Sequence, residues 1–314
     1  MRTDTMAVDT GDPGLRQEDD ASASFDYMGV LNSIRRSPEI VFRGLRSFFK
    51  QNPPPRKVFF VDQNAVKMEL PEDLARDPRL VHHHGPVPSV GLARNMVPQD
   101  PGVEWLVFCD DDGFLADDYV EKLVGILEKN PHLELVVGPY INETDGEFYS
   151  VRHSIGGRLD TVFGSKLLLG SNISIRTSTF NRIGRYDPRF GPGSSWPSSD
   201  ETDLCWRAIA AKVPMLYSPE IRVFHPPPHS ADTKEAVSKA YRYGKGKGAL
   251  VAKWMFERPH LLGFWEFVEM NAVPVLNMAR GMLRLELRQI PIQSAVLAGR
   301  YRGFFEFIVR RGRP

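Results

Sequence analysis

Short apolar runs alternate with segments of helical periodicity through the first half of the chain. The runs that we interpret as buried strands are residues 27–31, 58–61, 106–109, 133–137 and 166–175. The helices expected between them are residues 38–51, 90–97 and 117–130. This alternation predicts an α/β fold built on a mostly parallel sheet, with helices on both faces.

The pattern changes after residue 175. The expected elements are a short helix from residue 180, a loop rich in Gly, Pro and Ser at 191–199, a helix at 200–211, and strands at 215–217 and 221–225. Three prolines at 226–228 form a stiff linker, and the pattern is helical from there to the end. We therefore predict a domain at 25–230 and a helical extension at 231–314. Residues 1–24 hold six acids, two arginines and almost nothing apolar, which predicts a disordered tail.

Composition narrows the class of protein. With 314 residues, 42% hydrophobic and 25% charged, the chain can bury a large core. A net charge of +1 gives no overall basic footprint for nucleic acid. Cys109 and Cys205 both lie in apolar segments, which is typical of buried thiols in a reducing compartment. No apolar leader or bilayer-length stretch is evident, so we expect a cytoplasmic protein.

Three consecutive carboxylates, Asp110, Asp111 and Asp112, end the apolar run at 106–109. Acids packed this closely repel one another unless a cation compensates them, and Mg²⁺ binds through one or two carboxylates together with substrate phosphates. Open α/β sheets bind ligands at the carboxyl ends of their strands, which is where these acids fall. A solvated turn at Gly113 is the other interpretation.

A second acidic cluster begins the helix expected at 200–211. Asp200, Glu201 and Asp203 follow the flexible loop directly. Ser198 and Glu201 have the spacing of a capping box, which would make the cluster a helix start and nothing more. Alternatively, a carboxylate held rigidly here acts as a general base.

Seven segments, taken in order, resemble the family 2 glycosyltransferases, which are inverting nucleotide-sugar enzymes of the GT-A fold. The matching segments are 58–64, 91–95, 110–112, 170–176, 183–191, 200–207 and 223–225. The resemblance covers about residues 25–230. It implies a GT-A fold and transfer of a hexosyl-type sugar from a nucleoside diphosphate to a hydroxyl of a glycan or glycolipid acceptor, in polysaccharide or cell-envelope glycan assembly.

The resemblance also implies roles for individual residues. Asp62 would contact the nucleotide base, and Arg94 would lie near the nucleotide. Asp110 would hold the ribose or a metal-bound water, with Asp111 beside it. Asp112 would bind Mn²⁺ or Mg²⁺, which bridges the two phosphates of the donor.

Two further assignments follow from the same resemblance. The family's catalytic base corresponds here to Glu201, where the family has Asp, and Asp200 is the alternative. His225 is a candidate third metal ligand, or else a histidine that simply closes a strand. The first strand lacks the Pro and Tyr that the family usually carries, which puts the details of base recognition in doubt.

Three remaining segments lead to weaker predictions. The chain from 278 to 313 is basic and amphipathic, which predicts either contact with the inner face of a membrane or a helix packed on the core with a solvated basic face. The glycine and lysine run at 244–248 lacks the spacing of a phosphate loop, and we expect a flexible basic hinge. His82, His83 and His84 are expected in a polar connection.

Two rival functions remain open at this point. A haloacid-dehalogenase-like phosphatase also has a strand followed by closely spaced aspartates, the first of which is a nucleophile. A sugar-binding module without catalysis is the second rival, although such a module needs no general base.

Overall fold

The computed structural model describes residues 25–159, 167, 172–227 and 232–310. The predicted tail at 1–24 and half of the strand expected at 166–175 lie outside these residues. The strands of the large sheet are β1 (Tyr27–Ser33), β2 (Lys57–Asp62), β3 (Leu80–His84), β4 (Trp105–Cys109), β6 (Leu135–Val137), β8 (Gly157–Arg158), β9 (Ile173–Arg176) and β10 (Met215–Tyr217).

Within the described residues these strands lie in the order β3-β2-β1-β4-β9-β6-β10-β8. The pairs β1–β2, β1–β4, β2–β3 and β6–β10 are parallel, whereas β9 runs antiparallel to β4 and β6, and β8 runs antiparallel to β10. A small second sheet joins β5 (Phe114–Leu115), β11 (Val223–His225) and β7 (Tyr140–Asn142). The predicted mixed, mostly parallel sheet is therefore confirmed.

Helices cover both faces of the large sheet. They are α1 (Pro38–Phe49), α2 (Glu72–Ala75), α3 (Val90–Asn95), α4 (Tyr119–Lys129), α5 (Thr177–Arg182) and α6 (Asp200–Ala210), with a 3₁₀ turn, η1 (Val151–Ser154). Successive side chains of a strand point to opposite faces of the sheet, so a separate core forms on each face. Val30 and Phe108 pack with Leu204 of α6 in one core, whereas Leu31 and Val107 belong to the other.

The prediction of a polar connection at the three histidines was wrong. They belong to β3, the edge strand that pairs with β2. His82 stacks on the ring of Phe60, with the centroids 4.9 Å apart. An edge strand is only partly buried, so it tolerates polar residues that mask its hydrophobic pattern.

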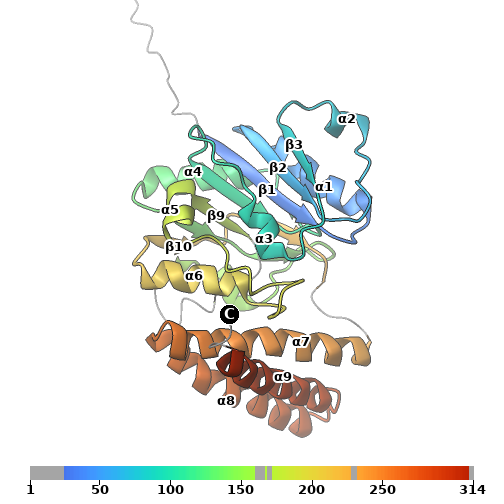
Figure 1. Ribbon diagram of the computed structural model, residues 1–314, viewed down its shortest axis with the longest axis vertical. Helices are drawn as coiled ribbons and strands as arrows, with labels where there is room; N and C mark the ends of the chain where they lie inside the picture. The colour runs from blue at the N-terminus through green and yellow to red at the C-terminus, as the bar shows by residue number, and fades with distance from the viewer. Residues whose placement is uncertain (1–24, 160–166, 168–171, 228–231, 311–314) are drawn as a thin grey trace, which may run out of the picture.

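Three long helices form a layer beneath α6 (Figure 1). They are α7 (Thr233–Ala252), which runs into a π-helical turn, η3 (Lys253–Glu257), and then α8 (Leu261–Leu283) and α9 (Gln289–Arg310). A third core joins this layer to the sheet domain. Its members include Phe190, Trp196 and Trp206 from the sheet domain, with Leu250, Trp254, Phe304 and Phe307 from the layer.

The glycine and lysine run at 244–248 is not a hinge. It lies within α7, where Gly248 faces the backbone carbonyl of Arg300, and Gly303 of α9 faces the carbonyl of Lys245. A Cβ at either glycine would collide with backbone atoms of the other helix. The glycines therefore allow α7 and α9 to pack at very short range.

Candidate active site

The two acidic clusters meet at one buried cation, Arg94. Its side chain is only 2% exposed. Nη2 donates to Asp110 Oδ1 at 2.7 Å, and Nη1 donates to Glu201 Oε1 at 2.9 Å and to Asp200 Oδ2 at 3.1 Å. The two acidic clusters, which are about ninety residues apart in the sequence, thus share one guanidinium, which fixes the distance between them.

Local structure explains why Arg94 stands here. It lies near the end of α3, whose first turn is capped by the Ser89 hydroxyl accepting from the Leu92 amide. The guanidinium carbon lies 5.1 Å from the ring centroid of Tyr186, a cation–π distance. The guanidinium contacts the protein's own carboxylates, and its predicted place near the nucleotide stays a prediction.

The three predicted metal ligands lie together on one side of Arg94. One ligand atom from each of Asp110, Asp112 and His225 falls within 4.8 Å of the others. Two carboxylates and an imidazole form a donor set that suits Mn²⁺ and, with fewer protein ligands, Mg²⁺. The residues present therefore fit a divalent cation.

Two tyrosines, which sequence reasoning missed, orient these ligands. Tyr140 Oη donates to Asp110 Oδ2, and the Tyr140 ring stacks on His225 with centroids 4.7 Å apart. Tyr149 Oη lies 2.6 Å from His225 Nδ1, so that Nε2 faces Asp112 Oδ1 at 2.9 Å. Burial opposes the charged form of His225, but Asp112 outweighs burial and raises the pKa of the imidazole.

Asp111 points away from this group. It accepts from Ser33 Oγ at 2.8 Å, and burial together with Asp112 raises its pKa. Arg36 lies 3.2 Å from Asp111 Oδ1 and 2.8 Å from Asp112 Oδ2, yet it is partly exposed. The sequence held no signal for Arg36, because it follows the atypical first strand and precedes an ordinary helix start.

A hollow of about 540 Å³ adjoins Arg36. It lies at the carboxyl ends of β1 and β2, and its walls come from 34–36, Pro38, 63–66, Met68 and Pro86. Asp62 is fully buried behind the wall. Its carboxylate accepts from the backbone amides of Met68 and Asn64 at 2.6 and 3.1 Å. It therefore holds the loop that shapes the hollow.

Asp200 and Glu201 differ in burial and in charge. Asp200 is 1% exposed, whereas the Glu201 side chain is 21% exposed. Burial and the adjacent Glu201 carboxylate raise the pKa of Asp200 well above its ordinary value. Burial also disfavours ionised Glu201, but Arg94 outweighs it, and the pKa of Glu201 is lowered. Of the two, Glu201 is the accessible carboxylate that stays ionised.

The capping box predicted at Ser198 and Glu201 is not formed. Ser199 is the N-cap, in the left-handed region at φ 73°, and its side chain caps nothing. Gly191, at φ 91°, closes the preceding loop onto Asp200, where a Cβ would lie 2.7 Å from the carboxyl carbon. The loop is thus shaped around the carboxylate pair.

Asp203 belongs to the scaffold and not to the site. It is fully buried and accepts from Lys253 Nζ at 2.6 Å, Arg207 Nε at 2.8 Å and Trp254 Nε1 at 3.0 Å. Lys253 also donates to Asp187 at 2.7 Å. These bonds tie α6 to the helical layer directly beside the site.

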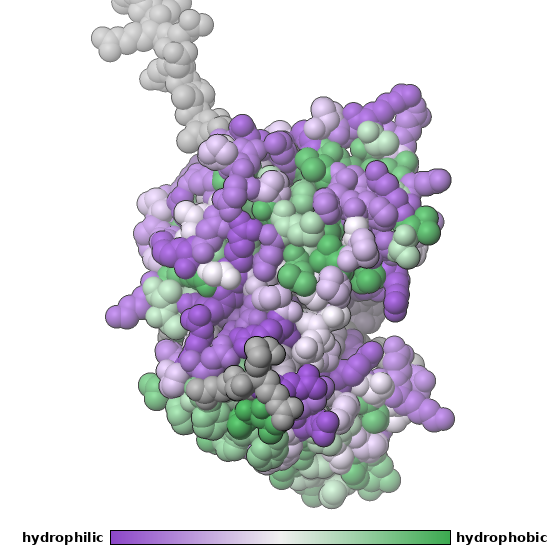
Figure 2. All heavy atoms as spheres, viewed as in Figure 1, coloured by the Kyte–Doolittle hydropathy of each residue, from purple (hydrophilic) through white to green (hydrophobic). Residues whose placement is uncertain are grey.

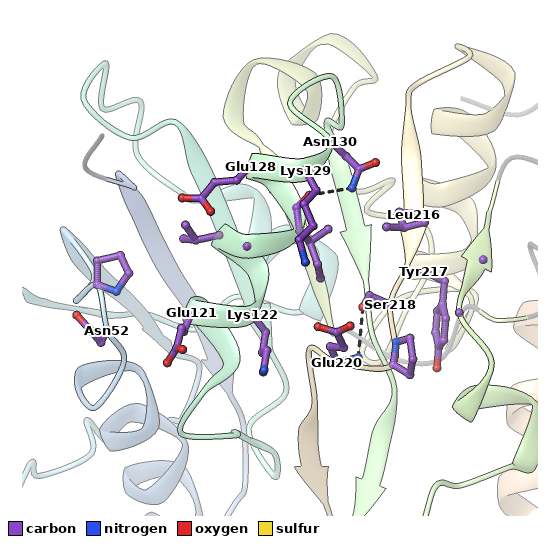
Figure 3. Close-up of a pocket in the computed structure, with 17 residues that line it drawn as sticks. Asn52, Glu121, Lys122, Glu128, Lys129, Asn130, Leu216, Tyr217, Ser218 and Glu220 are labelled. Atoms are coloured by element: carbon purple, nitrogen blue, oxygen red, sulfur yellow. Dashed lines mark hydrogen bonds between the residues drawn. The ribbon is translucent and has the colours of Figure 1, made fainter. Parts of the chain in front are cut away.

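Another hollow, of about 700 Å³, lies along α4 and the end of β10 (Figure 3). Side chains of both charge signs line it, including Glu121, Lys122, Glu128 and Lys129. None of its lining residues belongs to the acidic clusters or to Arg94, so the chemistry is concentrated elsewhere.

The fold and the carboxylates at its strand ends define the GT-A class of sugar transferases. Residues 32–187 match the family model described as glycosyl transferase family 2. The chain belongs to this family of glycosyltransferases, and the phosphatase alternative falls with that assignment. No curated protein sequence matches the chain.

Solved structures share the fold. The mannosyltransferase PcManGT from Pyrobaculum calidifontis, in complex with GDP-Man and Mn²⁺, aligns with a TM-score of 0.58 at 14% identity, over 89% of this chain and 87% of that one. GalNAc-T7 with UDP, GalNAc and Mn²⁺ aligns at 0.50 and 15% identity, over 72% of this chain but only 51% of its own. S. aureus TarS 1–349 aligns at 0.49 and 12% identity, over 92% of both chains.

Proposed function

We propose that the protein is a metal-dependent, inverting hexosyltransferase. It moves a sugar from a nucleoside diphosphate donor to a hydroxyl of a glycan or glycolipid acceptor, in polysaccharide or cell-envelope glycan biosynthesis. The observation that carries this proposal is the shared guanidinium of Arg94. It holds a metal-type ligand group, Asp110 with Asp112 and His225, beside an ionised carboxylate, Glu201.

The donor's diphosphate is assigned to the side of Asp112. Mn²⁺ or Mg²⁺ held by Asp110, Asp112 and His225 would neutralise the charge that develops on the leaving diphosphate. Arg36 is partly exposed beside Asp112 and offers a guanidinium, which suits phosphate oxygens. The structures of PcManGT and GalNAc-T7, which contain Mn²⁺ with donor-type ligands, support this choice of ligands.

The nucleotide base is assigned to the hollow beside Arg36. Arg36 lines that hollow and also contacts the metal-type group, so a nucleoside diphosphate can span the two. Asp62 contributes by holding the 63–68 loop in shape, through its bonds to Asn64 and Met68.

Glu201 is assigned as the general base. Inversion requires one in-line attack by the acceptor hydroxyl, with one carboxylate taking its proton. Glu201 is accessible and its pKa is lowered, which favours the ionised form that accepts a proton, whereas burial and Glu201 raise the pKa of Asp200. Arg94 keeps Glu201 a fixed distance from Asp110, and so from the donor.

The first test is the melting temperature with GDP, UDP, ADP and dTDP, each with and without Mn²⁺. Ligands that bind only the folded state raise this temperature by mass action. We expect one nucleoside diphosphate to stabilise the protein only when Mn²⁺ is present, and Asp112→Asn to abolish the effect. If no nucleotide acts in the presence of Mn²⁺, the proposal fails.

Glu201→Gln then separates an enzyme from a sugar-binding module. We expect turnover of the matching nucleotide sugar to fall by about 100-fold or more, with the nucleotide-induced shift retained. Glu128→Gln, in the hollow along α4, is the matched control and should keep full turnover. A sugar-binding module would show no turnover in the unmodified chain.

A further inference from the structure

One face of α8 is apolar and open to solvent along its whole length. We call it the α8 surface. Its exposed members are Leu261, Phe264, Trp265, Val268, Val275, Leu276, Met282 and Leu283, continued by Leu285 and Leu287 in the turn that follows. Figure 2 shows hydrophobic residues gathered along the lower edge of the molecule, over the helical layer.

The α8 surface is separate from the side of α8 that packs in the core. The opposite side of α8 is already buried against the layer through Leu262, Glu266, Met270 and Pro274. A helix on the surface of a water-soluble protein carries polar residues on its outer side. Here the outer positions recur at helical spacing as large apolar residues, and Leu283 is 86% exposed and Leu285 82%. A contiguous exposed patch of this kind marks an interaction site.

Positive charge surrounds one end of the α8 surface. Arg280, Arg284 and Arg288 are exposed between the leucines at the end of α8 and in the following turn, with Glu286 the one acid among them. This mixture of leucines and arginines suits a partner whose interior is apolar and whose surface is negatively charged. If two copies of this chain met at the α8 surface, these arginines would be buried with few carboxylates to pair with. A second copy is therefore a poorer fit than an anionic surface.

The helices of the layer do not cross a bilayer by themselves: within the described residues, none is long and apolar enough to do so. A helix with a wide apolar face and flanking arginines lies instead in the plane of the interface, its apolar side chains among the upper acyl chains.

We propose that the α8 surface docks the protein onto an anionic lipid bilayer, with its apolar side chains in the interface and Arg280, Arg284 and Arg288 on headgroup phosphates. This goes beyond the proposed transfer reaction and does not depend on it. The sequence pattern suggested membrane contact for residues 278–313, and the proposed surface begins earlier, at the start of α8.

Docking would orient the active site. Lys253 and Trp254, which lie between α7 and α8, bind Asp203 of α6 at 2.6 and 3.0 Å, two residues from Glu201. Ser198 Oγ, in the loop that covers the carboxylate pair, donates to the Tyr243 carbonyl of α7 at 2.9 Å. These hydrogen bonds connect the layer to the site, so a docked layer would hold Glu201 at a set height above the membrane.

The test is co-sedimentation of the full chain with vesicles of phosphatidylcholine, alone or mixed equally with phosphatidylglycerol. We expect binding to the mixed vesicles that weakens as salt increases. Leu283→Glu should reduce binding about tenfold or more, and Arg280→Gln with Arg284→Gln should reduce it about fivefold per arginine. Val151→Glu is the matched control, since Val151 is 83% exposed and lies on η1, outside the helical layer.

Three results would overturn the proposal. They are no binding to either vesicle, binding that Leu283→Glu leaves unchanged, and a dimer in lipid-free buffer that Leu283→Glu dissociates, which would assign the α8 surface to a second copy. Light scattering measures that oligomeric state. The nucleotide-induced melting shift should be the same in Leu283→Glu and the unmodified chain, so failure here is distinguishable from failure of the proposed transfer reaction.

Discussion

Arg94 shows how one residue can set the charge balance of a site. Asp110, Asp200 and Glu201 would repel one another without it, and its guanidinium contacts all three. Breaking a buried ion pair by removing one partner leaves an uncompensated charge in a medium of low dielectric, which is strongly destabilising. The same guanidinium lowers the pKa of Glu201 against the effect of burial. The stability of the fold and the basicity of Glu201 therefore both depend on the side chain of Arg94.

Arg94→Met should lower the free energy of unfolding by about 3–5 kcal/mol, measured by urea denaturation at neutral pH. Arg46→Met is the control, because Arg46 and its partner Asp73 are 44% and 55% exposed. An exposed pair contributes less than about 1 kcal/mol. Equal, small losses in both variants would show that the carboxylates around Arg94 need no cation.

At the scale of elements, the close approach of α7 and α9 depends on glycines. Gly248 and Gly303 each face a backbone carbonyl of the opposite helix. A glycine inside a helix costs about 1 kcal/mol relative to alanine, so its presence here indicates a packing requirement. The sequence showed the glycines but not the partner helix that makes them necessary.

Gly248→Ala should destabilise the protein, although alanine is the better helix former, because the new Cβ meets the backbone of Arg300. Gly125→Ala in α4 should instead stabilise it by about 0.5–1 kcal/mol, since nothing lies within 4 Å of that Cβ. Thermal and urea unfolding of both variants measure the difference. A stabilising Gly248→Ala would mean that α7 and α9 do not pack as described.

At the scale of the whole molecule, ion pairs and a shared core join the sheet domain to the helical layer. Lys253 is 2% exposed and lies 2.7 Å from Asp187 and 2.6 Å from Asp203. Phe190, Trp196 and Trp206 of the sheet domain pack in the same core as residues of the layer. The helical extension predicted at 231–314 therefore supports the site from below.

The contribution of Asp187 to stability should depend on pH. Burial alone would raise its pKa, but hydrogen bonds from Arg189 and Lys253 outweigh burial, so the folded-state pKa is lowered. Its contribution is therefore present above the unfolded-state pKa of about 3.9 and is lost as pH falls toward the folded-state value.

Comparison of the unmodified chain with Asp187→Asn by urea denaturation measures this contribution. The difference in the free energy of unfolding between the two chains should be largest near neutral pH and should decrease below about pH 3.9. A difference that stays constant with pH would mean that Asp187 acts through its shape and not through its charge.

The sequence by itself predicted the parts of this protein that depend on local pattern. The apolar strands and the acids that end them follow from the spacing of residues within one element. The parallel strand order then brings Asp62, Asp110 and the start of α6 to one edge, since parallel strands share their carboxyl ends. The seven matching segments predicted the family, because each of them is also a local pattern within one element or loop.

Only the tertiary structure decided which charges meet. The sequence did not predict that Arg94 contacts three carboxylates, and Arg36 and Tyr140 were not predicted at all. The resemblance already favoured Glu201 over Asp200 as the proposed base, and the structure adds the burial of the pair and the contact with Arg94, neither of which is visible in the order of residues. A sequence pattern reports periodicity within an element. Electrostatic energies depend on distances between elements, which only the folded chain sets.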